Sequence, residues 1–377
     1  MARNRDRKNN KIKLKSGDFV LVILTLLLVV FGVMMVYSSS YYYALSKFGD
    51  AYHYLKKDLG FAALGFVGML TLAMIDYKWY RKLAVPGLVV SIVLLILLFT
   101  PLGIERNYAT RWLGIGSFTL MPGEIAKIAV IIFVSWYLSR ENNIIHSFSR
   151  GIFPMLVLCG VFGGLIMLQP NMSTAITVCG IIVGIMFMAG MKWRYLFGLG
   201  TIGAAAMAIL IFSDEDGYRL KRVTSFLDPF ADPLDTGFQV VQSLLALGSG
   251  GFFGVGLGKS IQKNLYLPEP QNDFILAIIG EELGYFGILL LMLAYIVLIW
   301  RGFHIAINAK DMFGSLLASG ITIMIALQVL MNVAVVTSSM PVTGIALPFF
   351  SYGGTSLIIL LCAVGILLNI SRKTTKI

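Results

Sequence analysis

The chain consists mostly of long apolar runs separated by short polar connections. The stretches Phe19–Met35 and Leu83–Ile104 contain no ionisable residue, and each is long enough for a helix across about 30 Å of hydrocarbon. This pattern predicts an all-α, polytopic membrane protein with about ten transmembrane helices, because helices satisfy their own backbone groups in lipid. The predicted spans are residues 18–37, 58–75, 84–102, 124–138, 152–168, 173–190, 195–212, 273–300, 313–337 and 349–370.

One polar and glycine-rich segment, residues 213–272, interrupts this pattern between the seventh and eighth spans. A segment of this length inside a compact domain is usually functional or disordered. Its amphipathic run at 238–247 and its glycine cluster at 248–258 favour an ordered, partly re-entrant structure. We interpret it as a large extracytoplasmic loop within a single transmembrane domain, residues 18–372.

The composition supports a membrane protein. Hydrophobic residues make up 58% of the chain, charged residues 13%, and the mean hydropathy is +0.83. A soluble domain carries about 25% charged residues. The three cysteines lie inside apolar runs and the three histidines are scattered, so the sequence indicates neither a disulfide framework nor a histidine-based metal cluster.

The positive charge is concentrated at the N-terminus. Seven of the 30 Lys and Arg residues fall in the first 15 positions, although the net charge of +11 alone could suggest nucleic acid. This placement indicates a basic cytoplasmic tail, residues 1–17, that faces anionic membrane lipid, and no nucleic-acid partner. The predicted cytoplasmic segments hold 19 of the 30 basic residues and the outer segments ten, so we expect both termini, including residues 373–377, in the cytoplasm.

Ionisable residues at membrane depth are costly and are functional candidates. Glu124 and Lys127 are spaced i,i+3 at the start of a predicted helix, so they lie on one face and can pair. An internal ion pair that fixes helix packing is one interpretation. The alternative is that Lys127 binds an anionic substrate near the outer boundary.

Asp273 lies where the long loop enters the eighth span, followed by Glu281. At a helix start, a carboxylate could simply cap the helix or interact with its dipole. In a partly dry cleft it could instead act as a general base. Asp273 and Glu281 can face one cavity at a separation of about 12 Å along the axis, which is too far for a tight carboxylate pair.

Proline and glycine interrupt the chain at residues 340–356, just before the last span. Such breaks occur at membrane depth only where protein or a water-filled cavity surrounds the backbone. The freed N–H groups could bind an anion, or the segment could be a plain connection between two helices.

Ordered motifs over nearly the whole chain resemble the SEDS family of FtsW, RodA and SpoVE, and look most like FtsW and SpoVE. They are Met35-Val-Tyr-Ser-Ser39, Arg111-Trp112-Leu, Pro122-x-Glu124-x-x-Lys127, Gln169-Pro170, Phe226-Leu-Asp-Pro229-x-x-Asp232-Pro233, Gly237-Phe-Gln239-x-x-Gln242-Ser243, Tyr266-Leu-Pro-Glu269 and Pro341-x-Thr-Gly-x-x-Leu-Pro-Phe-x-Ser-Tyr-Gly-Gly354.

The resemblance implies a peptidoglycan glycosyltransferase that polymerises lipid II and releases undecaprenyl pyrophosphate, with a role in cell division. It implies Asp273 as the catalytic base, and a divalent cation, Mg²⁺ or Mn²⁺, as a cofactor. Positive charge from Lys127 and Arg111 would stabilise the leaving pyrophosphate. The expected substrate-binding residues are Lys127, Glu124, Arg111, Glu281, Gln242 and Ser351.

The resemblance also implies a class B penicillin-binding protein, a transpeptidase, as partner, together with other divisome or elongation proteins. Two other functions fit part of the pattern: a lipid II flippase and a non-catalytic divisome scaffold. The chain departs from the family pattern at Gly123, Asn171 and Asn272, where Ser, Asp and Thr are usual.

Overall fold

The computed structural model describes residues 17–106, 109–115, 118–141, 143–212, 224–234 and 237–374. The predicted basic tail up to residue 16, residues 213–223 of the predicted loop and the last three residues lie outside this part.

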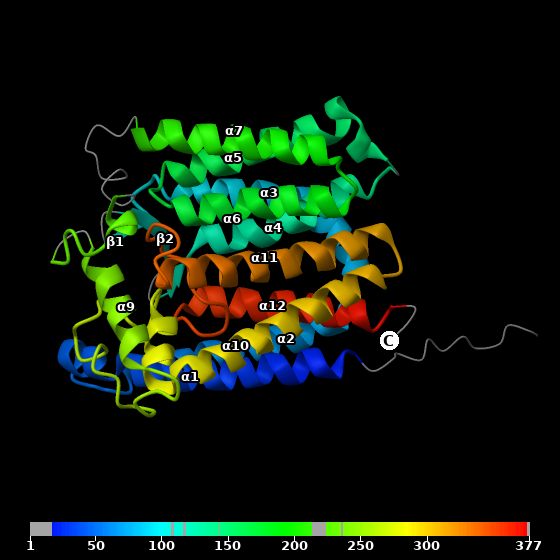
Figure 1. Cartoon of the computed structure of the whole chain (residues 1–377). Helices are drawn as coiled ribbons and strands as arrows, with labels where there is room; N and C mark the ends of the chain where they lie inside the picture. The colour runs from blue at the N-terminus through cyan, green and yellow to red at the C-terminus, as the bar shows by residue number, and fades with distance from the viewer. Residues whose placement is uncertain are drawn as a thin grey trace, which may run out of the picture.

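Figure 1 shows a bundle of helices that run side by side. The helices are α1 (Phe19–Phe48), α2 (His53–Met74), α3 (Tyr80–Leu97), α4 (Pro122–Leu138), α5 (Phe153–Met167), α6 (Met172–Met188), α7 (Trp193–Phe212), α9 (Phe238–Ser249), α10 (Ile275–Ile307), α11 (Met312–Val336) and α12 (Gly354–Ser371). Short turns are η1 (Tyr77–Trp79), η2 (Ile144–His146) and η3 (Phe148–Ile152).

The helical membrane fold predicted from the apolar runs is confirmed. Each of the ten predicted spans overlaps one helix, although α3 ends at Leu97 and α12 begins only at Gly354, and α9 is a shorter addition from the long polar segment. Among the described residues, seven helices are long and apolar enough to cross a membrane. The helix α1 continues to Phe48, well beyond the predicted end at residue 37, because the tyrosine- and serine-rich residues 37–43 extend the helix even though they are less apolar.

The two termini of the helical part meet at one end of the bundle. The backbone N–H of Asp18, which precedes α1, donates a hydrogen bond of 3.1 Å to Oγ of Ser371 at the end of α12. Figure 1 shows α9 and the strands at the opposite end. The start of α1 and the end of α12 therefore lie at the same end of the bundle.

A small antiparallel sheet adds to the helical fold. Its strands are β1 (Gly103–Arg106), β2 (Ala109–Ile115) and β3 (Phe118–Leu120), in the order β1-β2-β3. The all-α prediction did not include it, because strands of three to seven residues leave no clear alternation of polar and apolar positions. The sheet carries Arg111 at the same end of the bundle as α9 (Figure 1).

The glycine cluster after α9 fills a break in α10. Gly284 has φ +70°, so the helix interrupts its own hydrogen bonding there. The segment 250–256 supplies the missing partners: amides of residues 255 and 256 donate to the carbonyls of Glu281 and Glu282, and the amides of residues 285 and 286 donate to the carbonyls of residues 251 and 252. This backbone exchange shows that residues 250–256 are ordered against α10, and the re-entrant character of the segment stays a prediction.

Gly284→Ala is expected to destabilise the protein strongly. A backbone with φ +70° and ψ −170° is essentially limited to glycine and costs a residue with a Cβ about 1–3 kcal/mol, and this Cβ would also overlap the backbone amide of Gly254. Gly160→Ala on α5 is the matched control, because its Cβ would meet no heavy atom within 4 Å. Thermal unfolding in detergent should show a clearly lower midpoint for Gly284→Ala only, and equal midpoints would contradict the packing described.

Candidate active site

Asp273 lies at the junction between the long polar segment and α10. The N-cap position of this helix belongs to Phe274, so Asp273 does not occupy the capping position considered from the sequence. Its side chain is half-buried. Its backbone carbonyl accepts a hydrogen bond of 2.8 Å from Nδ2 of Asn332 on α11, and the same Nδ2 donates to the carbonyl of Ile345 at 2.8 Å. Asn332 therefore fixes Asp273 relative to the broken segment 340–353.

Asp273 and Arg111 converge on Gly344. A Cβ at this glycine would lie 3.1 Å from Oδ2 of Asp273 and 3.4 Å from a terminal nitrogen of Arg111. The guanidinium also donates a hydrogen bond of 2.6 Å to the carbonyl of Pro170. Three segments that are far apart in sequence thus bring the carboxylate of Asp273 and the guanidinium of Arg111 together next to Gly344, which has no side chain.

The surroundings of Asp273 raise the pKa of its carboxyl group above the ordinary value for aspartate. Burial raises the pKa of Asp273, the nearby Glu269 carboxylate raises it further, and Arg111 opposes both, so that the pKa lies at about 6. Glu269 is held by Nδ2 of Asn272 at 2.9 Å. A carboxyl group with a pKa close to the working pH can accept a proton efficiently while remaining mostly ionised at neutral pH.

The three residues noted from the sequence as departures, Asn272, Asn171 and Gly123, have local roles in the structure. The side-chain amide of Asn272 donates a hydrogen bond of 2.9 Å to the carboxylate of Glu269. Asn171 caps α6, because its side chain accepts a hydrogen bond of 3.3 Å from the backbone N–H of Thr174. Gly123 lies where α4 approaches α6, and a Cβ there would lie 3.0 Å from the Thr174 methyl group.

Gly344→Ala is expected to reduce the activity of this site about tenfold, because a misplacement of a reacting group by less than 1 Å is costly. The added methyl group would press on Oδ2 of Asp273 at 3.1 Å, and the carboxylate would have to shift. The kcat measured with purified protein tests this. Gly353→Ala, whose nearest heavy atom would be 3.5 Å away, is the control, and equal losses in both variants would contradict the proposed geometry.

Glu124 and Lys127 form the ion pair that their spacing predicts. Their charged atoms are 2.8 Å apart, with side-chain exposures of 10% and 4%. The second carboxylate oxygen of Glu124 accepts a hydrogen bond of 3.2 Å from Ser356 on α12. These contacts support the first interpretation, an internal pair that fixes packing, here between α4 and α12.

The carboxylate of Glu281 holds the polar loop. It accepts hydrogen bonds from the hydroxyl of Ser260 and from the backbone amides of Ile261, at 2.8 Å, and Gln262, at 3.3 Å. Its side chain is buried, so these contacts favour a structural role over the predicted contact with substrate.

Two further predicted substrate-binding residues have different surroundings. The hydroxyl oxygen of Ser351 accepts a hydrogen bond of 2.7 Å from the backbone N–H of Leu347, which closes the turn before α12. Gln242 lies half-buried on α9. The structure therefore brings together Asp273 and Arg111, while Ser351 shapes the adjacent backbone.

Sequence reasoning missed the contributions of Asn332, Gly344 and Lys263. Asn332 carries a signal, since it is an amide inside an otherwise apolar span. Gly344 lies in the broken segment, but nothing in the sequence shows which side chains meet there. Lys263, which forms a buried ion pair with Glu282, gives no signal within a loop that contains many charged residues.

The described residues contain no group of three or more His, Cys, Asp or Glu side chains that could hold a metal ion.

Known proteins are similar to this chain over almost its whole length. Stage V sporulation protein E of Bacillus subtilis (strain 168) is 45% identical over 361 residues, covering 96% of this chain and 98% of that protein. A probable peptidoglycan glycosyltransferase FtsW of Geobacter sp. (strain M18) is 41% identical and covers 96% of this chain and 98% of its own length.

Solved structures have the same fold. A chain from a study of how a peptidoglycan synthase complex coordinates polymerization and crosslinking has a TM-score of 0.78 and 27% identity, covering 96% of this chain and 100% of its own. The rod shape determining protein RodA of Thermus thermophilus has a TM-score of 0.70 and 26% identity, covering 96% of this chain and 99% of its own.

A family model described as "Cell cycle protein", which unites FtsW, RodA and SpoVE, matches residues 19–376. This match spans the bundle, the sheet and the Asp273 site. The chain therefore belongs to the FtsW/RodA/SpoVE family of polytopic membrane proteins.

Proposed function

We propose that this chain is a peptidoglycan glycosyltransferase that polymerises lipid II into glycan strands. The observation that carries the proposal is the half-buried carboxylate of Asp273, which meets Arg111 over Gly344 at one end of the bundle. The similarity to probable peptidoglycan glycosyltransferases of the FtsW type supports it. We assign the reaction to the outer face of the bacterial plasma membrane, with both termini in the cytoplasm.

In the proposed reaction, Asp273 accepts the proton from the 4-hydroxyl of an acceptor GlcNAc. The freed oxygen attacks C1 of the MurNAc at the reducing end of the growing lipid-linked chain. As the new glycosidic bond forms, the bond from C1 to the pyrophosphate breaks, and undecaprenyl pyrophosphate leaves with the electron pair. The guanidinium of Arg111 is suited to stabilise the negative charge that develops on this leaving group.

Activity is expected to fall as the pH drops through about 6, because the base must be ionised and burial raises the pKa of Asp273 to about 6. Glu269→Gln removes a negative neighbour that raises this pKa, so its acid limb should move to lower pH. The measurement is the pH dependence of kcat/KM for lipid II. An acid limb at the same pH in both proteins would contradict the assignment of that limb to Asp273.

We also propose that a divalent cation, Mg²⁺ or Mn²⁺, neutralises part of the pyrophosphate charge. The described residues provide no three-ligand metal cluster, so the phosphate oxygens would contribute most of the ligands. A chelator should then lower activity, and either cation should restore it.

We propose a class B penicillin-binding protein as the partner that crosslinks the strands. The related structure comes from a peptidoglycan synthase complex whose study concerns both polymerization and crosslinking, which supports this pairing. The family description "Cell cycle protein" and the similarity to FtsW support our proposal of a role in septal wall synthesis, with other divisome proteins.

The function is tested with purified protein in proteoliposomes that contain lipid II in both leaflets. A glycosyltransferase produces glycan strands that separate on a gel, with loss of lipid II from one leaflet only. A flippase would equalise labelled lipid II across the bilayer without polymer. A scaffold would do neither, although it would still bind its transpeptidase partner.

A further inference from the structure

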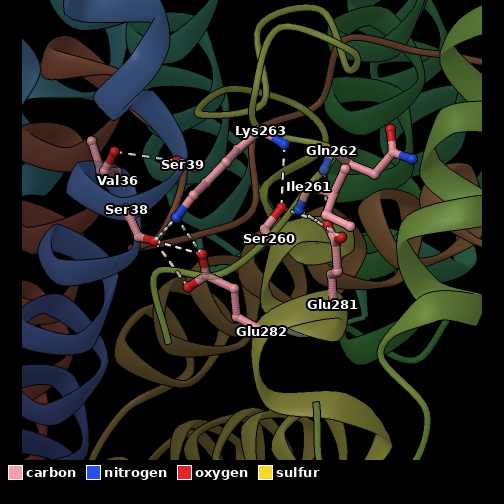
Figure 2. A network of polar contacts seen from close by, with 9 residues as sticks. All are labelled: Val36, Ser38, Ser39, Ser260, Ile261, Gln262, Lys263, Glu281 and Glu282. Atoms are coloured by element: carbon pink, nitrogen blue, oxygen red, sulfur yellow. Dashed lines mark hydrogen bonds and ion pairs between the residues drawn. The ribbon is translucent and has the colours of Figure 1, made fainter. Parts of the chain in front are cut away.

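A buried polar network connects α1, α10 and the polar loop (Figure 2). Nζ of Lys263 lies 2.8 Å from a carboxylate oxygen of Glu282, and the two side chains are 4% and 0% exposed. Ser38 of α1 completes the group: its hydroxyl donates to Glu282 at 2.7 Å and accepts from Lys263 at 3.1 Å. We call Ser38, Lys263 and Glu282 the buried triad.

The neighbouring residue on α10 holds the same part of the loop from a second direction. Figure 2 shows the carboxylate of Glu281 pointing at residues 260–262, which it binds through one hydroxyl and two backbone amides. Lys263 closes this stretch, because its own amide donates to Oγ of Ser260 at 3.2 Å. Two consecutive glutamates thus fix residues 260–263, which we call the anchor turn.

The anchor turn is the start of the segment that ends at Asp273, ten residues further along. Within that segment the amide of Leu267 donates to the carbonyl of Gln262, and the carbonyl of Gln271 accepts from the amide of Tyr352 at 2.9 Å. Asn332 holds the carbonyl of Asp273 itself. The segment is therefore fixed at its far end by α11 and the broken segment, and at its near end by the triad and Glu281.

A buried ion pair is an expensive way to achieve stability alone. Taking both charges out of water costs as much as their attraction returns, and well-packed apolar side chains of similar size often give equal or greater stability. The triad instead contributes specific geometry, because its hydrogen bonds define one position of the anchor turn relative to α1 and α10.

We propose that the buried triad positions Asp273 for glycosyl transfer, an inference that rests on the proposed function. The residues of the triad act through the anchor turn and do not contact the reacting atoms. The transfer step requires the carboxylate within hydrogen-bond reach of the acceptor hydroxyl, and a shift of about 1 Å can cost up to 100-fold in rate. Loss of Lys263, Glu282 or Ser38 is therefore expected to lower kcat.

Two neighbouring serines of α1 provide a matched pair for the first test. Ser38→Ala removes one arm of the triad, whereas Ser39→Ala removes a hydroxyl that binds only the carbonyl of Val36 in its own helix. We expect Ser38→Ala to lower kcat about three- to tenfold with little change in KM, the pattern of an interaction made in the transition state. Ser39→Ala should behave as wild type.

The second test separates positioning from stability. The double variant Lys263→Met with Glu282→Leu removes both charges, so no unpaired charge stays buried and the fold is expected to be retained. We expect kcat to stay at least about tenfold below wild type and hydrogen exchange to become faster over residues 260–273. The double variant Arg301→Met with Asp18→Asn is the control and should keep the wild-type kcat, since this pair also links α1 to α10, but at the other end of both helices.

The two tests distinguish a positioning role of the buried triad from a purely structural role. Wild-type kcat and unchanged exchange in a folded double variant, or equal effects of the two serine substitutions, would overturn the positioning role. Failure of the wild-type protein to make polymer would instead count against the proposed function. If the double variant does not fold, the serine pair still decides the question.

Discussion

Asp273→Asn is expected to lower the rate of glycan synthesis by at least about 100-fold, the lower end of what general base catalysis contributes. The amide has almost the same shape as the carboxyl group but cannot accept the proton of the acceptor hydroxyl. The backbone contact with Asn332 uses the carbonyl oxygen of residue 273, so the substitution leaves it in place. The loss should therefore appear in kcat, without a loss of folded protein.

Asn272→Ala is the control for this substitution. It removes a side chain next to Asp273 that binds Glu269 and leaves the carboxylate of Asp273 itself unchanged. We expect a modest effect on glycan synthesis, well below that of Asp273→Asn, and equal thermal unfolding midpoints for the two variants. A comparable loss in both would indicate that the loop, and not the carboxylate, determines activity.

Lys127→Met is expected to destabilise the protein by about 3–5 kcal/mol, the range measured when one partner of a buried ion pair is removed. Glu124 would stay charged at 10% exposure, with the hydroxyl of Ser356 as its remaining hydrogen-bond donor at 3.2 Å. Removing both charges, in Lys127→Met with Glu124→Gln, should recover most of this free energy of unfolding. The measurement is denaturant unfolding in detergent micelles.

The same double variant distinguishes the two interpretations of Lys127. If the pair only fixes α4 against α12, the double variant should be stable and should bind lipid II with an unchanged KM. A stable double variant with a strongly raised KM would show that Lys127 contacts the anionic substrate. Lys56→Met is the control, because this residue pairs with Asp50 on the surface and is 69% exposed, so its loss should leave the unfolding midpoint unchanged.

The helices were predictable because each one has to satisfy its backbone in lipid, and a long uncharged run such as residues 19–35 does this as a helix. The three-stranded sheet was not, because strands of three to seven residues leave no clear alternation of polar and apolar positions. The break at Gly284 was also hidden, since its missing helical bonds are replaced by backbone groups of residues 251–256, a contact that no periodicity reveals.

The candidate site was predictable in its residues more than in its geometry. A carboxylate at the start of a span and a spaced Glu124–Lys127 pair are visible in the sequence, and the pairing at 2.8 Å is confirmed. The meeting of Asp273 with Arg111 over Gly344 depends on how three distant segments pack. The same holds for Lys263 and Glu282, whose pairing depends on how the loop folds back onto α10.

The most direct test of the central claim is polymerisation of lipid II by purified protein together with its transpeptidase partner and a divalent cation. Wild type and Asp273→Ala are run side by side, and the glycan strands are separated on a gel. We expect strands from the wild-type protein and none from the variant, with both proteins folded and bound to the partner. Strands of similar length and amount from both proteins would contradict the catalytic role of Asp273.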